Sequence, residues 1–138
     1  MGPISTSFQV CYHGVMTHYP VVLIDDLRSF VQKRDDALVL RTLAEALSWF
    51  TDVKSEDTVG QLWLDHDLGK NDKGEIIEII PFVAELEERA YFGTAPEIEQ
   101  VIVHSSNNQR GPKMVVPLSR YFAVQTIAQS ELDNYLVQ

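Results

Sequence analysis

Three short apolar runs in this chain each end in side chains that can bind metal ions or transfer protons. The runs occupy 21–24, 61–64 and 101–103. The polar residues that follow them are Asp25 and Asp26, then Asp65, His66 and Asp67, and finally His104, Ser105 and Ser106. Short apolar runs are typical of buried strands, and parallel strands end together at the ligand-binding edge of an α/β sheet. We therefore expect these side chains to meet at one site.

The mixture of carboxylates and imidazoles indicates a divalent metal site. Carboxylates suit Mg²⁺ and Mn²⁺, imidazole nitrogen suits Zn²⁺, and the sequence leaves the choice among these three open. We assign Asp25, Asp65 and Asp67 as the carboxylates nearest the metal. Asp26 is either a further ligand or a residue that orients one. A bound metal polarises a phosphoryl oxygen and lowers the pKa of bound water to about 7.

Three of these residues are candidate catalytic residues: Asp65, His66 and His104. An imidazole titrates near neutral pH, so either histidine could be a metal ligand or a general acid or base. Successive strand residues face opposite ways, so Asp65 and Asp67 are expected to share a face while His66 points away, unless the chain has already turned into a loop. The candidate substrate-binding residues, which could cradle or pair with a phosphate, are Ser105, Ser106, Asn107, Arg110 and Lys113.

Helical spacing of apolar residues predicts the helices of the chain. Helices are expected over 43–50 and 76–92, with a short one over 113–120. Thr42 begins a capping-box pattern at the first of them. Pro81 conflicts with the second helix, because an interior proline removes a hydrogen bond and clashes with the preceding turn. It fits if it lies in the first turn of the main helix or kinks a longer one.

The remaining segments complete an alternating pattern. Further strands are expected over 37–41 and 122–127, a polar turn over 69–75, and a final helical turn within 131–137. Residues 1–20 are expected to form an irregular extension, with at most a short strand. Alternating strands and helices predict an α/β fold with a doubly wound, mostly parallel sheet. No composition shift or linker divides the chain, so 1–138 is expected to be a single domain.

Composition limits the kinds of partner. The 138 residues are 45% hydrophobic and 22% charged, with a net charge of −9 and one cysteine, Cys11. The negative charge argues against coating long DNA, since that requires neutralising phosphates with basic residues. It does not argue against a small phosphorylated nucleotide or an RNA end. No run is long enough to span a membrane, and the lone cysteine favours the reducing cytoplasm.

The ordered motifs LIDDLRSF, LWLDHDLG and VIVHSSN resemble the cyclic-phosphate processing receiver-like family. Its small domains are similar to response-regulator receivers and often occur in phage and bacterial sequences, which would make the host cytoplasm the compartment of a phage protein. The resemblance spans roughly residues 21–127 and also includes Gly74, Gly111 and Met114. LDHDLG followed at this distance by VHSSN is more specific than an isolated DD pair. The family implies a receiver-like (flavodoxin-like) fold and the processing of cyclic phosphates.

Differences from phosphoacceptor receivers argue against signalling. Asp25 and Asp26 fit the acid pair of those receivers, and Asp65 fits their phosphoaccepting aspartate. His104 lies where they carry a hydroxyl residue, and Gln125 lies about where they carry a lysine. Because that lysine couples phosphorylation to switching, a phosphorelay role is not expected here.

The resemblance and the candidate residues together predict a metal-assisted phosphoesterase. Its substrate would be a cyclic nucleotide, a cyclic oligonucleotide or an RNA 2′,3′-cyclic phosphate end. The alternatives are a non-catalytic receiver-like module that sequesters a nucleotide signal and a protein-interaction adaptor; the polar residues favour the enzyme. Arg28, close behind the acid pair, could reach the site from its loop, but we interpret it as a surface arginine.

Overall fold

The computed structural model describes residues 8–11, 14–104 and 112–138. Its strands are β1 (Phe8–Cys11), β2 (Gly14–Ile24), β3 (Ser29–Phe30), β4 (Ala37–Leu40), β5 (Thr58–Asp65), β6 (Asp67–Lys70), β7 (Ile76–Glu78), β8 (Glu97–His104), β9 (Val124–Thr126) and β10 (Leu136–Val137). Its helices are α1 (Leu43–Asp52), α2 (Ile80–Tyr91), α3 (Pro112–Leu118) and α4 (Gln129–Leu132). The predicted strands and helices along the sheet are therefore present, with shifted ends.

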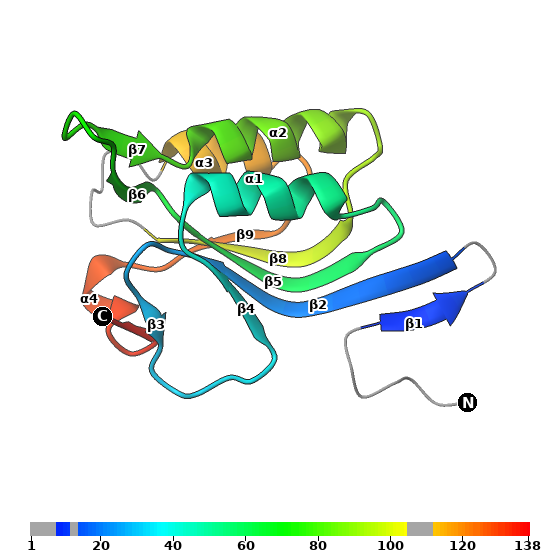
Figure 1. Cartoon of the computed structure of the whole chain (residues 1–138), viewed down its shortest axis with the longest axis horizontal. Helices are drawn as coiled ribbons and strands as arrows, with labels where there is room; N and C mark the ends of the chain where they lie inside the picture. Colours follow the sequence, from blue (N-terminus) through cyan, green and yellow to red (C-terminus); the bar gives the residue numbers. More distant parts are fainter. Residues whose placement is uncertain (1–7, 12–13, 105–111) are drawn as a thin grey trace.

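A parallel sheet in the order β4-β2-β5-β8-β9 runs through the centre of the molecule (Figure 1). Numbered along the chain, its strands follow the order 2-1-3-4-5, which is the flavodoxin-like order also found in receiver domains. β1 pairs antiparallel with the beginning of β2. The predicted receiver-like α/β fold with a mostly parallel sheet is confirmed.

Helices α1, α2 and α3 lie together on one face of the sheet (Figure 1). The Thr42 side chain caps α1 by accepting a hydrogen bond from the backbone N–H of Glu45 at 3.0 Å, as the capping pattern predicts. Phe50 of α1 and Phe82 of α2 are buried, with ring centroids 5.3 Å apart. Arg89 of α2 donates to the Phe50 carbonyl at 2.7 Å, which satisfies an acceptor near the end of α1. These contacts fix the helices above the strands that carry the site.

The opposite face is covered by shorter elements. The connection from β2 to β4, residues 25–36, contains β3 but no helix. The chain after β9 forms α4 and then β10, and β10 pairs with β3. Trp63 of β5 is buried in the centre of this layer, 5.2 Å from the Phe30 ring and 5.9 Å from the Tyr135 ring. Both faces of the sheet are therefore covered, as expected of a doubly wound sheet, but the long helices lie on one face and short elements on the other.

The segment between β5 and α2 differs from the prediction. Residues 67–78 form a hairpin of β6 and β7, where a polar turn and the beginning of a helix were expected. The Asn71 side chain closes the hairpin by accepting two backbone N–H groups of the turn, and Gly74 takes a φ of +79° there. Helix α2 begins at Ile80, so Pro81 lies in its first turn, where a missing N–H is tolerated.

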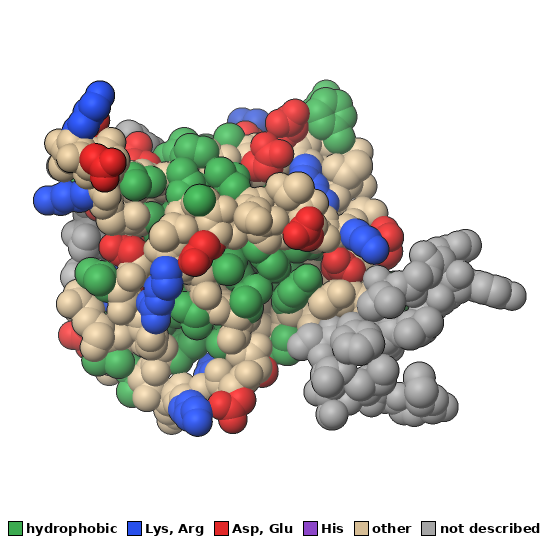
Figure 2. Space-filling view, viewed as in Figure 1, with side chains coloured by type: hydrophobic (Ala, Val, Ile, Leu, Met, Phe, Trp, Pro, Cys, Tyr) green, Lys and Arg blue, Asp and Glu red, His purple; other side chains and the backbone are tan. Residues whose placement is uncertain are grey.

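The two ends of the chain also differ from the prediction. β2 begins at Gly14 and β1 pairs with it, so the described part of residues 1–20 is largely strand rather than irregular. At the other end, the predicted final helical turn is present but lies earlier, as α4, and it is followed by the short strand β10; Leu132 and Leu136 both bury their side chains over the second face. On the face of the molecule seen in Figure 2, Lys and Arg side chains are scattered among Asp and Glu.

Candidate functional site

Asp25, Asp65 and His104 meet at the carboxyl edge of the sheet. Asp25 directly follows β2, while Asp65 and His104 are the last residues of β5 and β8 and are paired in register. Their relative exposures are 0%, 5% and 0%. One oxygen or nitrogen atom from each lies within 4.8 Å of those from the other two. Three adjacent parallel strands therefore deliver three buried polar side chains to one point.

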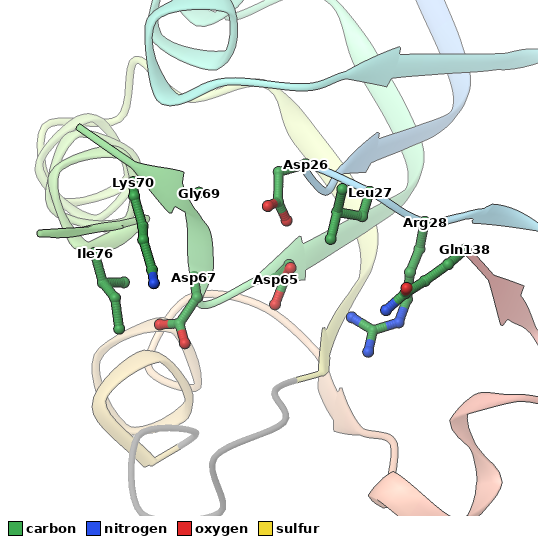
Figure 3. Close-up of a pocket in the computed structure, with 9 residues that line it drawn as sticks. All are labelled: Asp26, Leu27, Arg28, Asp65, Asp67, Gly69, Lys70, Ile76 and Gln138. Atoms are coloured by element: carbon green, nitrogen blue, oxygen red, sulfur yellow. The ribbon is translucent and has the colours of Figure 1, made fainter. Parts of the chain in front are cut away.

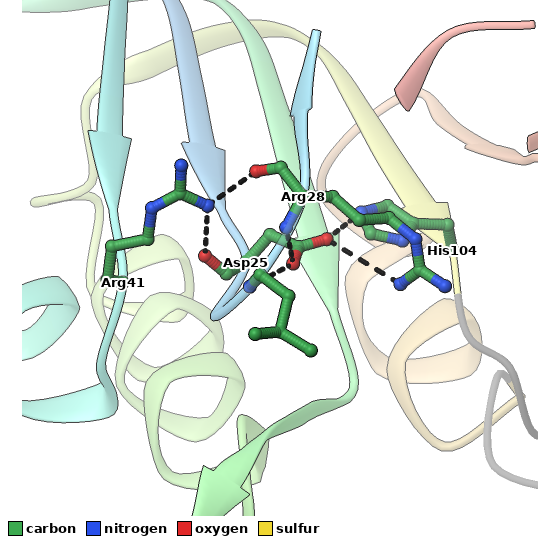
Figure 4. A network of polar contacts seen from close by, with 5 residues as sticks. Asp25, Arg28, Arg41 and His104 are labelled. Atoms are coloured by element: carbon green, nitrogen blue, oxygen red, sulfur yellow. Dashed lines mark hydrogen bonds and ion pairs between the residues drawn. The ribbon is translucent and has the colours of Figure 1, made fainter. Parts of the chain in front are cut away.

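Asp25 fixes the loop that follows it and also faces the site (Figure 4). Its Oδ1 accepts the backbone N–H of Leu27 at 2.9 Å and of Arg28 at 2.8 Å. The guanidinium of Arg41 donates to the carbonyl oxygens of both Asp25 and Arg28. The other carboxylate oxygen, Oδ2, lies 3.7 Å from His104 Nε2 and 3.9 Å from Arg28 Nη1. The backbone around Asp25 is thus held from two sides.

Burial and like charges shift the protonation of this group. Burial, followed by the charges of Asp25 and Asp26, raises the pKa of Asp65 to about 8, although Arg28 acts in the opposite direction. Burial also raises the pKa of Asp26. Burial lowers the pKa of His104, although the charge of Asp25 opposes this. Without a compensating cation, Asp65 therefore keeps a proton at pH 7 and His104 is neutral.

The buried atoms of this group fit a divalent cation. Within the described part of the chain, Asp25 Oδ2 and both ring nitrogens of His104 have no hydrogen-bond partner. Buried polar atoms are normally paired, so these atoms indicate a missing partner. Two ligands of one Mg²⁺ or Zn²⁺ ion are at most about 4.2 Å apart, and the three atoms here lie within 4.8 Å of one another, so a small movement would place all three on one ion. Two carboxylates with one neutral imidazole form a donor set that suits Zn²⁺ or Mn²⁺.

A pocket of about 250 Å³ opens beside this group (Figure 3). It is formed by the loop after β2, the end of β5, the β6–β7 hairpin and the last residue of the chain. Its lining residues are Asp26, Leu27, Arg28, Asp65, Asp67, Gly69, Lys70, Ile76 and Gln138. Figure 3 shows the three carboxylates lying between the side chains of Lys70 and Arg28. Asp65 belongs both to the buried group and to the pocket, so the two are continuous.

The four carboxylates predicted as metal ligands are divided between these two environments. Asp25 and Asp65 lie in the buried group with His104, whereas Asp26 and Asp67 line the pocket. Gly69, the last residue of the LDHDLG motif, has a φ of +85°, a conformation that L-residues with a Cβ avoid. It lies where the pairing of β6 with β7 shifts register, and this irregular geometry brings the hairpin against Asp26.

His66 lies apart from the buried metal-ligand group although it is next to Asp65. Its side chain is completely buried, and its Nδ1 lies 2.6 Å from Asp67 Oδ1. Its Nε2 lies 3.6 Å from Glu78 Oε1, and its carbonyl accepts the N–H of Ile79. His66 therefore connects the carboxylate of Asp67 to β7 rather than lining the pocket itself.

Most of the predicted substrate-binding residues lie outside the described part of the chain. These are Ser105, Ser106, Asn107 and Arg110. Lys113 belongs to helix α3, but its side chain is also outside the described part. Their assignment to a substrate phosphate therefore stays a prediction.

Two basic residues of the pocket were not assigned from the sequence. The interpretation of Arg28 as a surface residue is wrong: its side chain is 16% exposed and forms an ion pair with Asp25. The available signal was Asp25 at the end of an apolar run, because an aspartate in that position often accepts N–H groups two and three residues ahead and turns the chain back toward itself. Lys70 lines the pocket because β6 and β7 form a hairpin, where the sequence pattern predicts only a polar turn.

Gln125 does not bring a substitute for the receiver lysine to the site. It pairs in register with Ile102, two residues before His104, and its side chain accepts a hydrogen bond from Gln100. Within the described residues of β9, no cation reaches the carboxyl edge of the sheet.

Comparisons with known proteins point in the same direction as the geometry. The family model described as "Cyclic-phosphate processing Receiver domain" matches residues 21–120, which include Asp25, Asp65 and His104. No curated protein matches the chain, and no solved structure matches it. Among the described residues, no helix is both long and apolar enough to cross a membrane.

Proposed function

The chain belongs to the family of cyclic-phosphate processing receiver domains, and from this membership and the geometry of the site we propose that it is a metal-assisted phosphoesterase. The proposed reaction is hydrolysis of a cyclic phosphate in a cyclic nucleotide, a cyclic oligonucleotide or an RNA 2′,3′-cyclic phosphate end. One observation carries the proposal. The buried atoms of Asp25 and His104 that have no partner among the described residues lie beside Asp65, on the edge of an open polar pocket.

Asp25, Asp65 and His104 are the residues that we propose hold a divalent metal. The lowered pKa of His104 leaves its imidazole neutral, as a metal ligand must be, and a cation would displace the proton that the raised pKa of Asp65 retains at pH 7. A divalent ion bound there would supply Lewis-acid polarisation of a phosphoryl oxygen and lower the pKa of water. The positive charge of Arg28, which is paired with Asp25, offsets part of the negative charge of the carboxylates at this edge.

Ring opening consumes one water molecule. A bond forms between the water oxygen and phosphorus, one ring P–O bond breaks, and the released ester oxygen takes up a proton. We assign Asp67 to accept the proton of the water, because it lines the pocket and its carboxylate is oriented by His66. We assign Asp26 to donate the proton to the leaving oxygen, because burial raises its pKa and favours the protonated form.

The experiment that tests this proposal measures product formation from a panel of cyclic phosphates. The panel contains 2′,3′-cyclic AMP, 3′,5′-cyclic AMP, a cyclic dinucleotide and an RNA with a 2′,3′-cyclic phosphate end. Metal-stripped protein is assayed with Mg²⁺, Mn²⁺ or Zn²⁺ added back. Asp65→Asn is the test variant, and Asp35→Asn is its matched control, because the Asp35 side chain is 89% exposed and pairs with the equally exposed Lys33.

Metal-dependent conversion of one substrate by the wild type and by Asp35→Asn, with at least 100-fold loss in Asp65→Asn, would support the phosphoesterase. Stoichiometric binding of a nucleotide with no product would instead support a module that sequesters a nucleotide signal. Full turnover by Asp65→Asn would contradict the assignment of the site.

A further inference from the structure

The pocket beside the buried group has both acidic and basic walls. Its charged lining residues are Asp26, Asp65 and Asp67, with Arg28 and Lys70. In Figure 3 the Lys70 ammonium lies on the side of Asp67, and the Arg28 guanidinium lies on the side of Asp65. A pocket with only carboxylates would repel a phosphate. Two cations on separate walls give an anion a place to bind above the carboxylates.

Hydrogen bonds hold the backbone of Arg28 in place. Its N–H donates to Asp25 Oδ1, and its carbonyl accepts from the guanidinium of Arg41. The side chain leaves this fixed loop toward the site, where it is 16% exposed and 3.9 Å from Asp25 Oδ2. A distance of 3.9 Å is an ion pair without a hydrogen bond. The planar donors of a guanidinium match two oxygens of a phosphate, and here the backbone that carries the guanidinium is fixed before any ligand binds.

Lys70 approaches the pocket from a different element. It is the last residue of β6, directly after Gly69, whose positive φ turns the hairpin. Its side chain is exposed, and its strand partner Ile76 lines the same pocket. Because the ammonium is flexible and well hydrated, it suits an outer contact with a phosphate rather than a fixed one near the reacting bond.

We infer that Arg28 and Lys70 form an anion subsite in this pocket and hold the non-bridging oxygens of a phosphodiester in a nucleotide-sized ligand. Arg28 contacts the phosphate that lies over Asp65, and Lys70 contacts the ligand farther out, beside Asp67. The part of this inference that concerns turnover rests on the proposed phosphoesterase function, whereas the part that concerns binding does not. The basic residues assigned from the sequence, Arg110 and Lys113, are not needed for it.

The test compares Arg28→Met, Arg28→Lys and Lys70→Met with the wild type. Lys33→Met is the matched control, since the Lys33 side chain is 90% exposed and lies in the same connection between β2 and β4. Turnover of the best cyclic phosphate and equilibrium binding of Mn²⁺ are measured on each protein. We expect Arg28→Met to lower kcat/KM about 100-fold, with partial recovery in Arg28→Lys. We expect Lys70→Met to raise KM about 10-fold with kcat retained.

Mn²⁺ binding separates this role from a structural one. Removing the positive charge of Arg28 from beside Asp25 should leave Mn²⁺ affinity unchanged or increased, whereas collapse of the loop would reduce it. Unchanged KM and kcat in both Lys70→Met and Arg28→Met would overturn the inference. Loss of Mn²⁺ binding in Arg28→Met, together with normal kinetics in Lys70→Met, would overturn it as well.

The same variants keep the inference testable if the proposed function fails. If the wild type converts no member of the panel, binding of 2′,3′-cyclic AMP and 3′,5′-cyclic AMP is measured directly by calorimetry. Binding that weakens at least 10-fold in Lys70→Met and in Arg28→Met, but not in Lys33→Met, would support the subsite without turnover. Equal binding by all four proteins, or no binding by the wild type, would overturn it.

Discussion

Replacement of Asp65 by asparagine should change how the stability of the metal-free protein depends on pH. The pKa of Asp65 is raised to about 8 by burial and by the charges of Asp25 and Asp26. In the unfolded chain an aspartate has a pKa near 3.9. Between these values the folded protein binds more protons than the unfolded one. The free energy of unfolding contributed by this group must therefore fall as pH rises through that window.

The contribution of Asp65 can be isolated at the upper end of the window. His104 has a lowered pKa, so it gives the opposite slope, but only below the unfolded pKa of histidine near 6.5. From pH 6.5 to 8.0 the slope from Asp65 approaches about 1.36 kcal/mol per pH unit at most, which limits the loss of stability to about 2 kcal/mol. The amide introduced by Asp65→Asn cannot titrate, so the free energy of unfolding of this variant should fall far less over the same pH range.

Urea unfolding in the presence of a chelator, at pH 6.5 and pH 8.0, measures this difference. Wild type and Asp35→Asn should lose about 1–2 kcal/mol of unfolding free energy between the two pH values. Asp65→Asn should lose much less, and its stability relative to the wild type should therefore be greater at pH 8.0 than at pH 6.5. A wild-type stability that is level between the two pH values, or the same slope in Asp65→Asn, would refute the reasoning about this buried carboxylate.

Four further predictions rest on the same structure. Mn²⁺ should bind more tightly as pH rises from 6.5 to 8.0, by up to about tenfold per pH unit, because its binding releases about one proton. Calorimetry in buffers of different ionisation enthalpy measures that proton, and a pH-independent affinity would exclude Asp65 as a protonated ligand. His66→Ala should lower kcat about tenfold while Mn²⁺ affinity is retained, because Asp67 loses its orienting imidazole, and equal kcat would remove His66 from the mechanism. Gly69→Ala should destabilise the protein by about 1–2 kcal/mol, since its φ of +85° disfavours a Cβ; a smaller change in urea unfolding would indicate that the hairpin adjusts. Thr42→Ala should cost about 1 kcal/mol through loss of the helix cap, and unchanged stability in urea unfolding would mean that water replaces that bond.

The positions of Asp25, Asp65 and His104 could be predicted because they depend on sequence features of short range. Each follows an apolar run, and parallel strands in an α/β sheet end at the same edge. β5 and β8 are neighbours, and their apolar residues pair in the register that places Asp65 beside His104. The sequence therefore brings these three side chains to one edge of the sheet. It does not separate them from Asp67, which the structure places in the pocket, because that depends on the turn after β5.

The hairpin could not be predicted because two periodicities overlap in its second strand. Ile76, Ile79 and Ile80 have helical spacing, yet Ile76 pairs in β7, and helix α2 begins only at Ile80. The decisive feature is Pro81, which fits the first turn of a helix and not its interior. Lys70 and the contact between His66 and Glu78 both depend on this hairpin, so they were missed together with it.

Arg28 shows how this site differs in physical design from a signalling receiver. A receiver takes its cation from the end of the last parallel strand, but here Gln125 accepts a hydrogen bond from Gln100, and among the described residues the cation that pairs with Asp25 is Arg28, from the loop after β2. The backbone of that loop is held by Asp25 Oδ1 and by Arg41, and the Arg28 side chain that leaves it is paired with Asp25 in the absence of a ligand. A switch needs two arrangements of similar energy, whereas a site that stabilises charge on a phosphate gains from a cation that is already in place. The fixed loop therefore favours catalysis or tight ligand binding over switching.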